Sequence, residues 1–133
     1  MLLAAAAAAV DAAFAVVAHL SPYRRLAPFD RLWVAVCIAG HIGVYLSYTM
    51  PVSACRRLRT FADYVLWCAM ITAPLLRSKS LLAIAVVSMA GVGVLYYTHN
   101  RVCILTGAQW SPLAEWLYFP MLAFQLLALA WRL

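Results

Sequence analysis

Charged residues are what this sequence has least of. Only 11% of its 133 residues are charged, and Asp plus Glu number just 4. Soluble domains carry about 25% charged residues, whereas 68% of this chain is hydrophobic. The gaps between its apolar runs are too short to hold a soluble catalytic or nucleic-acid-binding domain. This composition is typical of a protein that lies almost entirely within a lipid bilayer.

Motifs for metal, phosphate or acyl chemistry are also missing. The sequence has no CxxC, HxxxH or HExxH pattern, no glycine-rich phosphate loop and no GxSxG turn. The nearest approach to a metal site is Cys37 with His41, four residues apart on one helical face, which Cys68 could join. Scattered cysteines are more typical of small buried apolar residues. We therefore expect no cofactor, no metal and no enzymatic activity.

What the sequence does have is long apolar stretches. A helix needs about 20 mostly apolar residues to cross a hydrocarbon core of ~30 Å. The stretches that approach this length are residues 2–20, 32–50, 61–76, 80–98 and 113–131. We expect an all-α fold, with residues 1–133 forming a single integral membrane domain: a polytopic transmembrane helical bundle of about five spans. The number falls to four if the alanine-rich first stretch does not cross.

Small residues recur every fourth position in the second stretch, at Ala35, Ala39, Gly43 and Ser47. Transmembrane helices associate through close van der Waals contact, which small residues at this spacing permit. We therefore expect this row to be the main helix-packing surface. Ahead of the third stretch, Thr60 is expected to cap the start of a helix.

Basic residues lie mostly in the gaps between stretches. With five spans, one side would hold Arg24, Arg25, Arg31, Arg77, Lys79 and Arg132, and the other Arg56, Arg57, Arg59 and Arg101. The richer side is expected to face inward, which places the N-terminus outside. These cations favour the lipid bilayer and its anionic headgroups as partners. They do not alternate with stacking aromatics as in single-strand grooves, so we expect no nucleic acid.

Polar residues inside apolar stretches are functional candidates. Asp11 and His41 are the two that we single out, either for a proton or ion pathway or for hydrogen bonds within the bundle. Cys55 and Cys103 fall in gaps expected on the same outer side, where a disulfide would persist. They form a candidate disulfide, and two free thiols are the alternative.

A short motif follows the fourth stretch. The residues Tyr96-Tyr97-Thr98-His99-Asn100-Arg101-Val102-Cys103-Ile104-Leu105-Thr106 combine an aromatic/His element with an N-x-x-C-x-L-T pattern. With the hairpin expected over residues 61–110, this resembles small multi-span membrane proteins of large eukaryotic DNA viruses. An acid commonly follows the threonine in that pattern, whereas Gly107 does here. The resemblance implies a membrane protein of a virus particle.

The expected function is structural. We expect an integral membrane protein of a larger assembly of protein subunits, in first place a virion membrane or minor capsid-associated component in a viral inner membrane. One alternative is an accessory subunit of an energy-transducing complex in an organellar membrane. Another is a small proton or ion transporter, or a channel subunit, that uses Asp11 and His41.

Overall fold

The computed structural model describes residue 16 and residues 25–48, 52–103 and 109–133, with the side chains of 52–55 excepted. All regular structure in these ranges is helical, so the expected all-α class is confirmed for this part of the chain. The elements are α2 (Pro28–Ser47), α3 (Val52–Thr72), a 3-10 turn η2 (Ala73–Leu75), α4 (Lys79–Thr98) and α5 (Pro112–Arg132).

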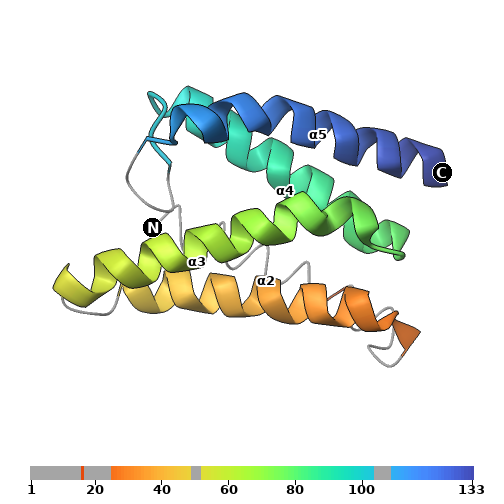
Figure 1. The fold of residues 1–133 in the computed structure, drawn as a ribbon, viewed down its shortest axis with the longest axis horizontal. Coiled ribbons are helices and arrows are strands. Elements are labelled where there is room, and N and C mark those ends of the chain that lie inside the picture. Colours follow the sequence, from red (N-terminus) through yellow and green to blue (C-terminus); the bar gives the residue numbers. More distant parts are fainter. Residues whose placement is uncertain (1–15, 17–24, 49–51, 104–108) are drawn as a thin grey trace.

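The four helices form two antiparallel pairs (Figure 1). Helix α2 packs along α3, and α4 packs along α5. The pairs join where α3 passes through η2 into α4 and diverge from there, so α3 and α4 do not form the tight hairpin that their short connection suggests. We call this junction, with the start of α2 and the end of α5, the Pro74 end. The opposite end, where α4 leads into α5, is the Trp110 end.

Three of the described helices are long and apolar enough to cross a membrane: α2, α4 and α5. Each has 20 or 21 residues, or ~30 Å at 1.5 Å per residue, which matches a hydrocarbon core. Helix α3 is not among them, because it includes Arg56, Arg57, Arg59 and Asp63. The expectation of about five spans is therefore not supported. The first stretch, 2–20, lies outside the described residues except for Val16.

Helix α3 begins at Val52, directly after Pro51, rather than at Phe61. Thr60 is consequently not a cap; it lies inside the helix and its Oγ1 donates a hydrogen bond to the Arg56 carbonyl at 3.0 Å. Arginine and leucine are good helix formers, so the helix extends through residues that the apolar pattern had assigned to a gap. Cys55, expected in that gap, is helical as well.

Only the second half of the expected row lies in the contact between α2 and α3. Ala35 and Ala39 are exposed, whereas Gly43 is partly buried and Ser47 is buried. A row of residues four apart advances about 40° per step around a helix, or roughly 120° over three steps, so it starts outside the α2–α3 contact and ends within it. The buried row instead alternates steps of three and four through Trp33, Cys37, Gly40, Val44 and Ser47.

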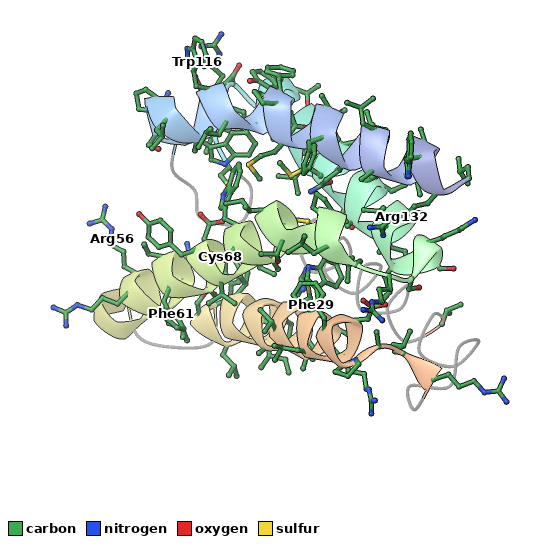
Figure 2. The ribbon with its side chains drawn as sticks, turned by 45° about the vertical axis from the view of Figure 1, so that its right-hand side comes forward. Phe29, Arg56, Phe61, Cys68, Trp116 and Arg132 are labelled. Atoms are coloured by element: carbon green, nitrogen blue, oxygen red, sulfur yellow. The ribbon has the colours of Figure 1, made fainter. Side chains whose placement is uncertain are left out.

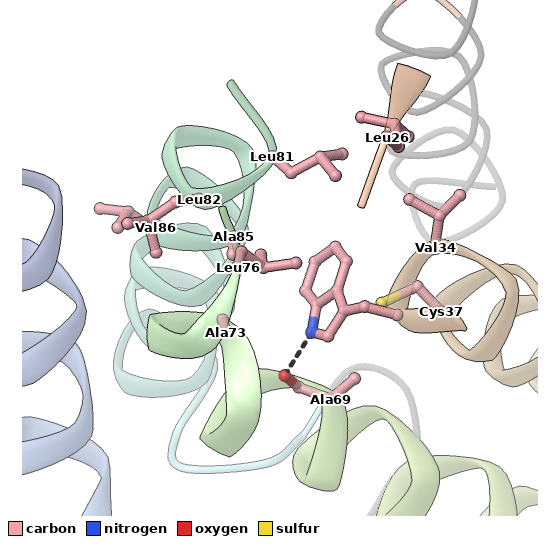
Figure 3. Close-up of a cluster of buried hydrophobic side chains, with 11 residues drawn as sticks. Leu26, Val34, Cys37, Ala69, Ala73, Leu76, Leu81, Leu82, Ala85 and Val86 are labelled. Atoms are coloured by element: carbon pink, nitrogen blue, oxygen red, sulfur yellow. Dashed lines mark hydrogen bonds between the residues drawn. The ribbon is translucent and has the colours of Figure 1, made fainter. Parts of the chain in front are cut away.

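Close approach of α2 and α3 depends on glycine. A Cβ added at Gly40 would lie 2.8 Å from Cδ2 of Leu66, and one at Gly43 would lie 3.1 Å from the Ala62 Cβ. Val44, Ala62 and Leu66 form a small buried cluster there. The largest cluster lies at the Pro74 end and draws on α2, α3, η2 and α4 (Figure 3). Its side chains place the core at the junction of the two pairs.

Candidate functional site

Polar side chains in this bundle concentrate at the Pro74 end, around the break in α3. Proline has no backbone N–H, so the carbonyl four residues earlier, that of Met70, loses its helical donor. Gln125 of α5 replaces it: its Nε2 donates to the Met70 carbonyl at 2.7 Å. Gln125 is only 1% exposed. A proline break in an apolar environment is tolerated where a neighbouring helix supplies the missing hydrogen bond.

Two further side chains bind carbonyls at the end of α3. Trp33 of α2 donates from Nε1 to the Ala69 carbonyl at 2.6 Å, the bond drawn in Figure 3. Arg132 of α5 donates from Nη2 to the Pro74 carbonyl at 2.7 Å. Helices α2 and α5 thus both attach to the Pro74 end through backbone carbonyls of α3 and η2. Each such bond contributes about 0.5–1.5 kcal/mol, and more where the donor is charged.

Asp30 connects the first helix pair to the second. Its Oδ1 accepts the backbone N–H of Arg77 at 2.9 Å, and its Oδ2 accepts that of Ser78 at 2.8 Å. These groups precede α4, where the helix dipole favours a negative charge. Asp30 is 1% exposed, and both carboxylate oxygens are occupied. The carboxylate therefore clamps the start of α2 to the start of α4.

The Trp110 end is built on aromatic rings. The rings of Tyr96 and Trp110 stack with centroids 3.9 Å apart, and Trp67 of α3 meets Trp110 edge-on at 5.3 Å. Tyr96 donates its hydroxyl proton to Glu115 Oε1 at 2.5 Å and accepts the Trp110 backbone N–H at 3.3 Å. These bonds attach the segment before α5 to the end of α4, and Trp67 brings in α3.

Tyr118 of α5 fits over a glycine on α4. Its hydroxyl donates to the Met89 carbonyl at 2.9 Å, and a Cβ at Gly93 would overlap the hydroxyl and Cζ of Tyr118. Gly91, by contrast, has no heavy atom within 4 Å of such a Cβ. The α4–α5 contact therefore depends on the absence of a side chain at Gly93.

Of the two intramembrane candidates from the sequence, only His41 can be placed. It is partly buried, and its Nδ1 lies 2.7 Å from the carbonyl of Cys37 in its own helix. Asp11 lies outside the described residues, so its pairing with His41 stays a prediction. Asp63 lies partly buried inside α3.

The cysteines are distributed over the fold. Cys37 is buried and Cys68 is exposed. Cys103 is buried with a free thiol, and the side chain of Cys55 lies outside the description, so the Cys55–Cys103 disulfide stays a prediction. Among the described residues, no group of three or more His, Cys, Asp or Glu is placed to hold a metal ion.

Three residues that hold the Pro74 end together were not predicted from the sequence: Asp30, Trp33 and Gln125. Arg132 entered the prediction only through the count of charges on each side of the membrane. A usable signal was present. Pro74 lies within an apolar stretch, so it must leave a carbonyl that needs a donor. Gln125 is an amide in another apolar stretch and can provide one. Pairing the two across the bundle requires the fold, however.

Comparison with known proteins adds no family to this description. No protein-family model, curated protein or solved structure matches this chain.

Proposed function

We propose that this protein is a structural, multi-pass integral membrane component of a larger assembly. The observation that carries the proposal is how the polar groups of the bundle are used. Trp33, Gln125, Arg132 and Asp30 each bind backbone atoms of another element. Such bonds fix helices relative to one another, as a scaffold requires. They do not line a path for an ion.

The exposed surface of α5 supports the same proposal. Only Tyr118 and Gln125 are buried among its 21 residues. Trp116 is 81% exposed and points away from the bundle (Figure 2). The other large exposed apolar side chains of this helix and its end are Leu113, Leu117, Phe119, Phe124, Leu126, Leu127, Trp131 and Leu133. An apolar surface of this extent is suited to lipid tails and to neighbouring subunits.

Among assemblies, we place a virion membrane, with the protein tied to a capsid, first. The support is the motif from Asn100 to Thr106 and its resemblance to viral membrane proteins; residues 104–106 lie outside the described part. An accessory subunit of an organellar energy-transducing complex shares the same physical features. A transporter has less support, because the His41 ring binds a carbonyl of its own helix.

The test is the composition of the particle released by mild detergent from membranes that contain the full chain. Resistance to alkaline carbonate extraction is measured first and establishes membrane integration. A complex with capsid proteins in fixed stoichiometry supports the virion reading, and one with respiratory subunits supports the organellar alternative. A lone 14.7 kDa chain that conducts protons in liposomes would contradict the structural proposal.

A further inference from the structure

The basic side chains at the Pro74 end lie around a single corner. Asp30 binds the backbone of Arg77, which places the start of α2, including Arg31, beside the start of α4. Arg132 binds the Pro74 carbonyl, which brings the end of α5 to the same corner (Figure 2). The five described cations that we call the basic corner are Arg25, Arg31, Arg77, Lys79 and Arg132.

The exposed cations of this corner are Arg25, Arg77 and Lys79, and among the described residues no exposed acid lies next to them in the sequence. Asp30 is the acid next to it, yet it is 1% exposed and both of its oxygens accept backbone N–H groups. At the Trp110 end, by contrast, Glu115 is partly exposed, and Arg59 lies 4.4 Å above the Tyr48 ring. Among the described residues, the exposed charges of this corner are therefore all positive.

Large exposed apolar side chains lie one or two residues from these cations in the sequence. Trp131, next to Arg132, is 92% exposed; Leu75 is 65% exposed and Leu32 is 61% exposed. A ligand that covers this surface has to combine negative charge with hydrocarbon. A phospholipid with an anionic headgroup offers both, with Trp131 suited to the interface between its tails and head.

We propose that the basic corner is a binding surface for anionic phospholipid headgroups, so that the leaflet at the Pro74 end is enriched in such lipids around the protein. This inference rests on the proposed membrane function. A basic residue near an anionic membrane surface strengthens association about fivefold. Removing two should weaken the preference for anionic over zwitterionic lipid roughly 25-fold.

The experiment uses the full chain in phosphatidylcholine micelles doped with phosphatidylglycerol, with bound lipids counted by native mass spectrometry. The test variant is Arg77→Gln with Lys79→Gln, which leaves the backbone N–H groups for Asp30 in place. The matched control is Arg56→Gln with Arg57→Gln, two exposed cations at the other end. We expect the wild type and the control to retain phosphatidylglycerol and the test variant to lose it, with all three equally helical by circular dichroism.

Equal losses in the two variants would mean that net charge alone attracts the lipid, and would overturn the proposal. So would a wild type without preference. Displacement by millimolar inorganic phosphate would identify a free-anion site, and displacement by polyglutamate an acidic protein partner; either result overturns the lipid assignment. Carbonate extraction is scored separately, so a chain that stays in the membrane without lipid preference refutes this inference and leaves the proposed function standing.

Discussion

Replacing Gly93 by alanine tests the α4–α5 contact most directly. The new methyl group would overlap Tyr118, whose ring is 3% exposed. The overlap includes Cζ as well as the hydroxyl, so a rotation of the hydroxyl hydrogen cannot relieve it. Tyr118 has to leave its site. Its hydrogen bond to the Met89 carbonyl and its ring contact with Trp110, 5.4 Å between centroids, are then lost.

The cost follows from these losses. A buried polar group without a partner costs about 1–3 kcal/mol, an aromatic pair contributes about 0.5–1.5, and overpacking costs about 1–3. Because the losses share one cause and are not additive, we expect Gly93→Ala to lower the free energy of unfolding by about 3–5 kcal/mol. Gly91→Ala is the matched control. With no atom near its Cβ, it should gain about 0.5–1 kcal/mol from helix propensity.

The assay is equilibrium unfolding in mixed detergent and dodecyl sulfate micelles, followed by circular dichroism. A second background, Tyr118→Leu, separates the clash from a general effect on α4. There, Gly93→Ala should cost far less, and the difference measures the coupling of the two residues. Equal stability of Gly91→Ala and Gly93→Ala in the native background would refute the reasoning, as would an unchanged cost in the Tyr118→Leu background.

Three further substitutions probe the rest of the bundle, each by the same unfolding measurement. Asp30→Ala leaves two backbone N–H groups without their acceptor and should lower the free energy of unfolding by about 2–4 kcal/mol. Asp30→Asn keeps one acceptor and should cost less. Equal costs for the two variants would contradict the role of the carboxylate as a clamp. Gln125→Leu removes the donor to the Met70 carbonyl and should cost about 1–3 kcal/mol, but little in a Pro74→Ala background, where the helix regains its own donor. Gly40→Leu should lower the free energy of unfolding by about 1–3 kcal/mol or more, because the new side chain overpacks against α3. Ala39→Leu, at an exposed position, should be tolerated. A larger loss for Ala39→Leu than for Gly40→Leu would mean that helix α2 packs through the row that contains Ala39.

The apolar pattern located α4 and α5 closely, and α2 to within four residues at each end, because lipid-compatible helices need a continuous apolar run of fixed length. Helices α4 and α5 lie within a residue of the expected stretches, and Ser111 caps α5 by accepting the Ala114 N–H at 3.2 Å. The pattern failed for α3, since it marks where a helix can contact lipid and not where the helix begins. Arg56, Arg57 and Arg59 continue the helix in spite of their charge.

The polar junction was harder to predict for a different reason. Met70 and Gln125 are far apart in the sequence, and their bond exists only because α5 crosses the end of α3. The position of Asp30 in the sequence suggests a purely local role. It stands in the first turn after Pro28, where an acid is ordinary for a helix start, and that ordinary role conceals the second one. Its carboxylate serves the start of α4 rather than the start of its own helix.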